Sequence, residues 1–467
     1  MKQTITTIAR LARRNAVALL ALLVALSGSS YAADTVATKL RPRNSVGSAQ
    51  VINGSLQKVD FSKKVKGARG AQGPQGAAGP AGSAGPQGPK GDTGDPGAPG
   101  QTGAQGPQGT TGPALLRSPP GANVVTTVEV GDVSGTSTTI GVDGLGLISY
   151  IDFANNDLKV AHCDNPACTS SAKSTLDSLT DTGIYTSVTI GTDGLGLISY
   201  RDVTNNALKV AHCDNIACTT ASKSTLDTGG EYSSVTIGTD GLGLISYNSG
   251  AALNVAHCDD VACTTAIETT LDSGGLLGGY SSVTIGGDGL GLISYFDAGN
   301  GDLKVAHCDN PLCTTATKTT LDGGGGDAVG DYTSVTIGAD GLGLISYHDQ
   351  TNEDLRVAHC NNTVCTGAIL STLDSTGQAG LYTSATVGTD GLGLISYHGP
   401  TGLKVAHCNN SLCAGASTAT LDSGSVNDTS ATVGADGLGL VSYASATLDL
   451  KVAHCSSTFC VPYFRRR

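Results

Sequence analysis

Tryptophan is absent from this 467-residue chain, and aromatic residues of any kind make up only 4% of it. Without tryptophan, strong stacking on sugar rings is not expected. Arginine is also scarce in the second two thirds of the chain, where only Arg201 and Arg356 precede the three terminal arginines. A sialidase-like glycosidase binds a carboxylate with several arginines and carries an S-x-D-x-G-x-T-W box, which this sequence lacks. A glycosidase of that kind, or a lyase, is therefore the least favoured function.

Long hydrophobic runs are also missing. The longest, Ala16–Leu26, has 11 residues, whereas a membrane-spanning helix needs about 20. It follows several basic residues between Lys2 and Arg14 and precedes the small-x-small site Ser30-Tyr31-Ala32. We interpret residues 1–32 as a signal peptide, with a retained membrane anchor as the alternative. The mature chain is expected to be secreted or held at the cell surface, without a transmembrane segment.

Positive charge is scarce in the C-terminal region. Residues 119–467 carry 13 Lys and Arg against 35 Asp and Glu, a net charge of −22, whereas residues 33–118 carry 10 against 4, a net charge of +6. An acidic surface repels a phosphate backbone, so nucleic acid is not an expected partner. The basic segment could associate with anionic envelope polymers, although the asymmetry is equally consistent with solubility alone.

Glycine, in contrast, is abundant and strictly placed. It occupies every third position from Gly67 to Gly112, which makes 16 uninterrupted G-x-y triplets that end at Ala114. Only glycine fits at the axis of three wound polyproline II chains, so this period predicts a collagen triple helix over residues 67–114 rather than a disordered linker. At about 3 Å per residue the rod would be about 140 Å long. Because a triple helix needs three chains, we expect a homotrimer.

Two shorter segments flank the G-x-y region. Residues 33–66 contain an apolar residue every five positions, at Val46, Val51, Leu56 and Phe61. This spacing is consistent with a short β element that registers three chains, and equally with a disordered leader. Residues 115–122 are expected to form a linker.

The remainder of the chain, residues 123–467, repeats one unit seven times. The unit is G-x-D-G-L-G-L-[IV]-S-Y, a variable gap, and then V-A-H-C-x-x-x-x-C, with successive copies 45 to 52 residues apart. A period in this range is typical of repeat architectures. Seven near-copies cannot each be a separate active site, so most of the recurring residues are expected to be scaffold. No nucleophile with a unique partner stands out, and we expect a protein that is not an enzyme.

Each repeat is predicted to form four short strands separated by turns. In the second copy these are residues 185–191, 195–200, 208–213 and 218–226, which fit an antiparallel sheet. Apolar residues on both faces of the second strand predict a sheet packed between two neighbours. The fold class is therefore predicted to be all-β, a seven-bladed β-propeller of four-stranded antiparallel blades. A solenoid of the same units is the alternative.

The two ends of the repeat region predict how the ring closes. The last copy has a poor fourth strand, residues 460–464, which contains Pro462. An extra strand-like segment, residues 123–130, precedes the first copy. We expect this N-terminal strand to complete the seventh blade.

All 14 cysteines lie in the repeats as C-x4-C pairs, which flank the turn between the third and fourth strands. In an exported chain this pattern predicts seven local disulfides, each worth about 2 kcal/mol because the closed loop is short. A His-Cys-Cys metal site is the alternative, but C-x4-C is not the usual zinc spacing and adjacent residues of a strand point to opposite faces. The predicted pairs are Cys163–Cys168, Cys213–Cys218, Cys258–Cys263, Cys308–Cys313, Cys360–Cys365, Cys408–Cys413 and Cys455–Cys460.

The histidine before the first cysteine of each pair is interpreted as a structural residue. We expect it to hydrogen-bond a neighbouring turn, through the aspartate of the D-G pair such as Asp193. A ring of seven histidine ligands is the alternative. The seven residues are His162, His212, His257, His307, His359, His407 and His454.

Two further motifs resemble ligand-binding loops. The G-x-x-G-x-G spacing of residues 191–196 opens a strand rather than a helix and occurs seven times, so a hairpin turn explains it better than a phosphate-binding loop. Asp-rich turns such as residues 152–157 lack the EF-hand spacing. No cofactor is predicted, although single turns could bind calcium weakly.

One position differs in almost every copy. The residue after I-S-Y is Ile151, Arg201, Asn248, Phe296, His348, His398 and Ala444 in turn. Such variation predicts an exposed position in the loop between the second and third strands, on one face of the propeller. Arg201, Phe296, His348 and His398 are the candidate ligand-contacting residues, and neutral variation of a solvated loop is the alternative.

The G-x-y segment followed by a C-terminal domain resembles the bacterial collagen-like exported proteins. The unit ISYxDxxxxxLKVAHCxxxxCT resembles tandem repeats of exported bacterial proteins that are predicted to form propellers. The resemblance implies a trimeric secreted or surface protein that displays propeller heads on a rod, for adhesion or for binding an extracellular protein or glycan. A lectin-like propeller, with the seven I-S-Y tyrosines and loop residues as sugar contacts, is the alternative.

Overall fold

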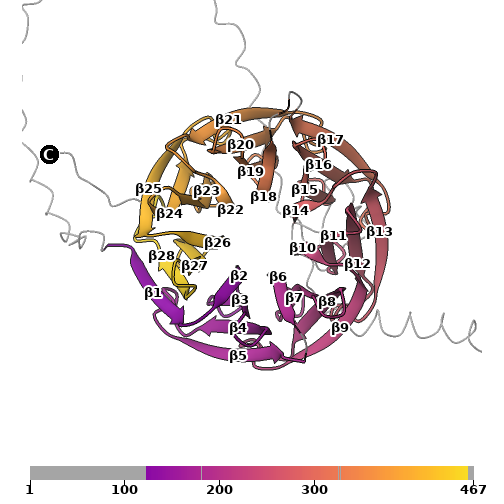
Figure 1. The fold of residues 1–467 in the computed structure, drawn as a ribbon, viewed down its shortest axis with the longest axis vertical. Helices are drawn as coiled ribbons and strands as arrows, with labels where there is room; N and C mark the ends of the chain where they lie inside the picture. The colour runs from indigo at the N-terminus through magenta and orange to yellow at the C-terminus, as the bar shows by residue number, and fades with distance from the viewer. Residues whose placement is uncertain (1–121, 180, 324–325, 327, 461–467) are drawn as a thin grey trace, which may run out of the picture. The chain divides into compact units, whose positions relative to one another are not determined.

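The computed structural model describes residues 122–179, 181–323, 326 and 328–460. The predicted signal peptide, N-terminal segment and collagen-like segment lie outside the described residues, as do residues 461–467. The described chain forms 28 strands in seven four-stranded antiparallel sheets. Figure 1 shows these sheets arranged as the blades of a closed ring. The predicted seven-bladed propeller is confirmed, and the solenoid is excluded.

Each blade runs from an innermost strand beside the central channel to an outermost strand at the rim (Figure 1). The innermost strands are β2 (Val133–Ile140), β6 (Thr182–Ile190), β10 (Glu231–Ile237), β14 (Gly279–Ile285), β18 (Val329–Ile337), β22 (Leu381–Val387) and β26 (Val426–Val433). The second strands are β3 (Gly146–Asp152), β7 (Gly196–Asp202), β11 (Gly243–Ser249), β15 (Gly291–Asp297), β19 (Gly343–Asp349), β23 (Gly393–Gly399) and β27 (Gly439–Ser445).

The third and fourth strands complete each blade. The third strands are β4 (Asp157–Cys163), β8 (Ala207–Cys213), β12 (Ala252–Cys258), β16 (Asp302–Cys308), β20 (Asp354–Cys360), β24 (Gly402–Cys408) and β28 (Leu450–His454). The outermost strands are β5 (Ser171–Asp177), β9 (Ala221–Thr228), β13 (Ala266–Asp272), β17 (Ala316–Asp322), β21 (Ala368–Asp374), β25 (Ala416–Ser423) and, in the seventh blade, β1 (Val124–Glu129).

The G-x-D-G segment forms the hairpin between the first and second strands. The Gly191 N–H donates to the Leu195 carbonyl at 2.7 Å, and the Leu195 N–H donates to Asp193 Oδ1 at 3.0 Å. Gly194 has a φ of +82°, which explains why glycine follows the aspartate. The fourth strand of this blade begins at Ala221 rather than at the predicted Cys218, because Cys218 turns the chain with a φ of +51°.

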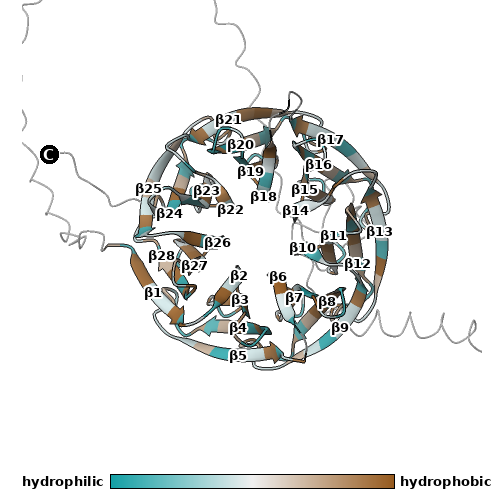
Figure 2. Ribbon diagram, in the orientation of Figure 1, coloured by the Kyte–Doolittle hydropathy of each residue, from teal (hydrophilic) through white to brown (hydrophobic). Residues whose placement is uncertain are grey.

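The hydrophobic core is a ring of clusters between neighbouring blades. Between the first and second blades, Leu147 packs with Ile198 and Tyr200 and with the disulfide cysteines Cys213 and Cys218. A side chain such as Ile198 contributes about 1.5–3 kcal/mol when fully buried. The second strands are buried on both faces, as predicted, whereas an outermost strand such as β5 is exposed or partly buried in its first five residues and buried only in its last two. Figure 2 shows hydrophilic stretches on the outermost strands at the rim. The propeller is therefore stabilised mainly by contacts between blades.

The ring closes through the N-terminal strand. Strand β1 pairs antiparallel with β28, with Val125 opposite Ala453, and so becomes the fourth strand of the last blade. Just before β1, the Asn123 side chain donates to the Cys460 carbonyl at 3.0 Å and accepts from the Ser456 N–H at 2.8 Å. The predicted closure is confirmed. Nowhere in the described part of the chain is there an apolar helix long enough to span a bilayer.

Candidate ligand-binding site

The variable position after I-S-Y does not lie in a loop. It belongs to the second strand of every blade and pairs with a leucine of the third strand, as Arg201 does with Leu208. His348 is buried, while Arg201, Phe296 and His398 are partly buried. The expectation of an exposed loop position is therefore wrong, because the chain turns only after the next residue or two.

Two of the four candidate residues are held by carboxylate partners. Arg201 Nη1 lies 2.5 Å from Glu231 Oε1 of the next blade, and His348 Nδ1 lies 3.0 Å from Asp331 Oδ1. Phe296 pairs with Gly279 through the backbone of the neighbouring strand. Burial lowers the pKa of the His398 imidazole. They occupy equivalent places in four different blades, and none of them lines the central cavity described below. The structure does not bring them together as one contact surface.

The tyrosines of I-S-Y are likewise not available to a ligand. All seven have an exposed fraction of 0%, which excludes them as sugar contacts. The hydroxyls of all except Tyr150 join neighbouring blades by donating to an aspartate. Tyr200 donates to Asp177 Oδ2 of the preceding blade at 2.8 Å, and Lys209 Nζ lies 2.5 Å from the same oxygen. In the first blade, Glu129 of β1 takes the place of this aspartate and accepts from Lys159 at 2.7 Å. The repeated tyrosine, aspartate and lysine therefore hold the blades together.

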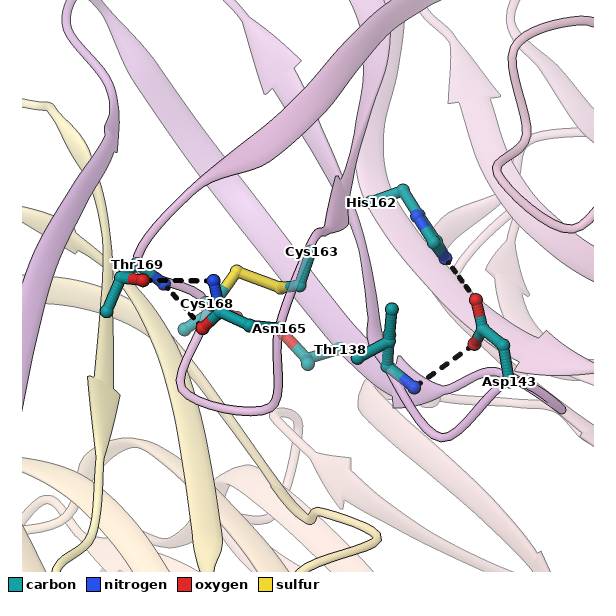
Figure 3. Close-up of a disulfide and its surroundings, with 9 residues drawn as sticks. Thr138, Asp143, His162, Cys163, Asn165, Cys168 and Thr169 are labelled. Atoms are coloured by element: carbon teal, nitrogen blue, oxygen red, sulfur yellow. Dashed lines mark hydrogen bonds and ion pairs between the residues drawn. A yellow bond between two sulfur atoms is a disulfide. The ribbon is translucent and has the colours of Figure 1, made fainter.

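The cysteines and the repeated histidines also belong to the scaffold. All seven C-x4-C pairs form local disulfides with Cα–Cα distances of 4.7–4.8 Å, and no described cysteine is free. Figure 3 shows the first pair, Cys163–Cys168, with the Asn165–Thr169 hydrogen bonds of its loop. In the same view His162 Nε2 contacts Asp143 Oδ2 at 2.9 Å.

Each repeated histidine lies 2.8–2.9 Å from the aspartate of its own D-G turn. In the sixth copy, His407 Nε2 is this close to Asp390 without the angles of a hydrogen bond. Each contact connects the hairpin between the first and second strands of a blade to the third strand of the same blade. Because the histidines are dispersed in this way, they do not form a ligand ring. No group of three or more metal-ligating side chains occurs among the residues with described positions.

A second set of tyrosines lines a cavity at the central channel. The cavity has a volume of about 380 Å³ and is lined by one stretch of each innermost strand. In the five blades from the second to the sixth, that stretch begins with a half-buried tyrosine. These ring tyrosines are Tyr185, Tyr232, Tyr280, Tyr332 and Tyr382. They were not among the candidates drawn from the sequence.

The backbone directs each ring tyrosine toward the channel. The pairing register of every innermost strand shifts at this point, as between Ile184 and Ser187 in β6. The five tyrosines have φ values between +50° and +56°, a conformation that is an outlier for a bulky residue and costs about 1–3 kcal/mol. β-Bulges of this kind re-aim a side chain and are common next to functional sites. The five tyrosines therefore occupy a backbone conformation that costs free energy for a bulky side chain and directs that side chain to the cavity.

The five rings form one continuous stack around the channel. Neighbouring ring centroids are 4.3–4.5 Å apart, and neighbouring planes are inclined by 43–58°. This inclination is close to one seventh of a turn, as expected when the ring planes run parallel to the propeller axis. At such short separations neighbouring rings are in direct contact, tilted against each other rather than parallel. The tyrosine side chains thus form one connected wall of the cavity.

Four of the ring tyrosines have a raised pKa and are neutral hydrogen-bonding groups at physiological pH. Burial raises the pKa of Tyr280 to about 12, and the nearby Tyr232 and Asp331 contribute to this increase while a hydrogen bond with Tyr332 opposes it. Burial is also the main cause that raises the pKa of Tyr185, Tyr332 and Tyr382. Their hydroxyls therefore stay protonated and can both donate and accept.

The stack is interrupted at the first and seventh blades. Gly135 occupies the tyrosine position of the first blade, and Asp428 occupies that of the seventh. Both keep the left-handed backbone, with φ values of +57° and +49°. Tyr185 and Tyr382, at the two ends of the stack, therefore each have a ring neighbour on one side only. This gap is the place where the seven-fold symmetry of the channel is broken.

A belt of hydrogen bonds supports the cavity from within the channel wall. Two residues after each tyrosine position, a serine Oγ accepts the backbone N–H of the next blade at 2.9–3.2 Å, as Ser187 does from Val235. The belt passes through all seven blades, including those without a tyrosine. The backbone at the gap is therefore held like the rest of the ring, and only the side chains differ.

A comparison with protein families identifies one part of the chain. Residues 64–123 match the family described as collagen triple helix repeat (20 copies), which includes the predicted G-x-y segment. No curated protein matches this chain in sequence. The chain thus combines a collagen triple-helix repeat region with a seven-bladed propeller.

Among solved structures, the chain is similar to a protein of unknown function from Dyadobacter fermentans, with 11% identity over 71% of this chain and 97% of that one and a TM-score of 0.47. It is also similar to a polysaccharide lyase described as an ulvan lyase, with 11% identity over 70% and 94% and a TM-score of 0.49. A third is the α-L-arabinofuranosidase of Fusarium graminearum in complex with arabinobiose, with 9% identity over 72% and 98% and a TM-score of 0.48.

Proposed function

We propose that this is a non-enzymatic, trimeric protein of the cell exterior, in which a collagen-like rod displays three propeller heads that bind a ligand. The observation that carries the proposal is the interrupted tyrosine stack. Most of the repeated polar residues of the head join strands or blades to one another. The strained tyrosines and the gap beside them instead line one cavity. The cavity therefore supports binding better than the dispersed positions after I-S-Y.

Binding without turnover fits the charged groups at the cavity. Asp428 is the one acidic side chain among the described residues that line it. Glycoside hydrolysis ordinarily uses a pair of carboxylates that flank the scissile bond. A single carboxylate among neutral hydroxyls can orient a ligand but lacks the second group that such a reaction requires.

The rest of the chain supports display outside the cell. Seven disulfides are typical of proteins in an oxidising compartment, and a collagen repeat forms by association of three chains. Three heads on one rod would strengthen a weak single-site interaction through effective concentration. The ligand class at this level is an extracellular protein or a glycan.

The test is binding of the full-length protein to arrays of glycans and extracellular-matrix proteins, with and without calcium. We expect saturable binding that free ligand competes, that does not require calcium, and that leaves the ligand chemically unchanged. Reduction of the disulfides should abolish it. Release of a cleaved product would make the protein an enzyme, and a blank from a correctly folded trimer would indicate a spacer or coat role.

A further inference from the structure

The gap in the tyrosine stack has a free carboxylate oxygen. Asp428 Oδ2 accepts hydrogen bonds from the Ser134 hydroxyl and, at 3.0 Å, from the Gly135 N–H. No donor in the described chain contacts Oδ1, and the carboxylate is only partly buried. One oxygen thus positions the side chain, and the other is left for a ligand.

The charge around this oxygen is negative and is not compensated within the cavity. The other described residues that line the cavity are Tyr, Thr, Ser and Gly, so no basic side chain is present there. The negative charge of Asp428 also contributes, after burial, to the raised pKa of Tyr382. The surrounding region carries a net charge of −22 over residues 119–467, which attracts cations and repels anions.

We propose that the gap between Tyr382 and Tyr185 binds a primary ammonium group, supplied by a lysine side chain of an extracellular partner protein. This inference rests on the proposed ligand-binding function and names the chemistry of its ligand. Asp428 Oδ1 and the tyrosine hydroxyl oxygens are hydrogen-bond acceptors, and an ammonium group has three donors. The slender aliphatic stem of lysine can lie along the tyrosine side chains.

Other ligand classes fit the gap less well. A quaternary ammonium group has no N–H donor and binds through aromatic faces arranged around it, whereas each ring here is in contact with a neighbouring ring and Asp428 Oδ1 requires a donor. A calcium ion takes six to eight oxygen ligands, commonly from several carboxylates, and only one carboxylate lines the cavity. An anionic sugar would meet an unpaired carboxylate without a compensating cation.

Gly135 keeps the gap open, and the structure shows how to close it. A Cβ atom at Gly135 would lie 3.5 Å from Ile151 Cγ2 and 3.9 Å from Tyr185 N, which are ordinary contacts. Its φ of +57° matches the +56° of Tyr185. A tyrosine at this position can therefore adopt the conformation of the five existing ones, so Gly135→Tyr should fill part of the gap without changing the backbone.

The experiment is isothermal titration of the full-length protein with Nα-acetyl-lysine amide. We expect saturable binding that weakens with salt, is reduced about 10-fold or more by Asp428→Asn, and is lost in Gly135→Tyr. The matched control is Asp132→Asn, which removes the same charge from an exposed position outside the cavity and should leave the affinity unchanged. Thermal unfolding of each variant verifies the fold, and the isosteric Asp428→Asn keeps the test decisive if Gly135→Tyr does not fold.

Three probes separate the ligand classes. The ε-acetylated lysine derivative, choline and glucose should each bind at least about 10-fold more weakly than the free amine. Equal binding of the ε-acetylated derivative, or an unchanged affinity in Asp428→Asn, would overturn the ammonium assignment. If Gly135→Tyr abolishes the binding of a ligand found on the arrays but Asp428→Asn leaves its affinity unchanged, the ammonium assignment is wrong and the proposed ligand-binding function stands. If the folded protein binds neither a ligand on the arrays nor the lysine derivative, both the ammonium assignment and the proposed ligand-binding function are wrong.

Discussion

The glycine of the L-G-L segment is required by the disulfide of its own blade. A Cβ atom at Gly196 would lie 2.7 Å from Cys213 Sγ and 2.8 Å from Leu147 Cδ2 of the preceding blade. Both neighbours are buried, so neither can move away cheaply. This steric requirement accounts for a glycine at the same place in all seven copies.

Replacing Gly196 by alanine should therefore destabilise the propeller. We expect Gly196→Ala to lower the free energy of unfolding by about 1–3 kcal/mol, because overpacking forces neighbouring side chains out of place. Urea unfolding followed by circular dichroism measures this change. Gly415→Ala is the matched control, since its Cβ would lie 3.7 Å from Asn409 Nδ2. Equal stability of the two variants would contradict the explanation.

The buried aspartates between blades should make the stability depend on acid pH. Burial alone would raise the pKa of Asp272, but hydrogen bonds from Lys304, Tyr295 and Lys318 outweigh it and hold the pKa at about 2. This pKa is below the ordinary aspartate value of about 3.9. Between about pH 2 and pH 4 the folded chain therefore binds fewer protons than the unfolded chain. The stabilisation is complete above about pH 4 and is lost as the pH falls from about 4 to 2.

The corresponding measurement is urea unfolding between pH 2 and 7 for the wild type and Asp272→Asn. The variant should be less stable at pH 7, because Lys304 loses its partner, and the difference should narrow as the pH falls toward 2. Exposed Asp132→Asn serves as the control. A difference that stays constant across this pH range would contradict the assigned role of Asp272.

At the residue scale, the sequence predicts scaffold roles better than ligand contacts. The cysteine pairs and the histidine–aspartate contacts follow from fixed spacing within one repeat. The variable position after I-S-Y was misinterpreted because variation was taken to mean exposure. In the structure the position is buried or partly buried in all seven blades, and two of its residues have carboxylate partners, Glu231 for Arg201 and Asp331 for His348. Variation there does not mean exposure.

At the element scale, the N-terminal strand determines whether the ring is closed. Strand β1 supplies the fourth strand of the last blade and also places Glu129 against the first blade. Glu129 lies 2.7 Å from Lys159 and 2.8 Å from Lys173. It therefore joins the two blades between which the ring would otherwise open.

Removing this carboxylate should weaken the closure. We expect Glu129→Ala to reduce the free energy of unfolding by about 1–3 kcal/mol, between the values for exposed and buried ion pairs. Thermal unfolding of the full-length protein measures the effect. Glu268→Ala, at an exposed position of β13, should change the stability by less than about 0.5 kcal/mol. A Glu129→Ala variant as stable as this control would show that the pairing of β1 alone closes the ring.

Strand number and closure could be predicted from the sequence because both depend on local patterns and on the two ends of the repeat region. The tyrosine stack was missed because the Y-[ST]-S segments resemble ordinary strand starts. A comparison of the first strands across the copies would have revealed it, since tyrosine is replaced by Gly135 in the first copy and by Asp428 in the seventh. The bulge and the left-handed backbone that turn these residues to the channel have no such signal in the sequence.

At the scale of the whole molecule, the collagen repeat predicts that avidity depends on the triple helix. Gly88→Asp places a side chain at the crowded axis in the middle of the G-x-y region and should disrupt the rod locally. Gln87→Asp introduces the same residue at the neighbouring y position of a G-x-y triplet, where collagen sequences accept side chains, and is the matched control. We expect sedimentation to show a weakened trimer for Gly88→Asp and a stable trimer for Gln87→Asp.

The same pair of variants links the rod to binding. Affinity for an immobilised ligand should fall by about 100-fold or more in Gly88→Asp, because effective concentration is lost. Affinity for the soluble ligand should be unchanged, because each head keeps its own cavity. Equal binding of both variants to the immobilised ligand would show that the heads act independently of the rod.

We propose that the head binds its ligand at the interrupted tyrosine stack. The most direct measurement is calorimetric titration of the full-length protein with a ligand identified on the arrays, in the wild type and in Gly135→Tyr. We predict one ligand per head, three per trimer, and no binding to a Gly135→Tyr variant that circular dichroism shows to be folded. An unchanged affinity in a correctly folded Gly135→Tyr variant would place the ligand elsewhere and contradict the account.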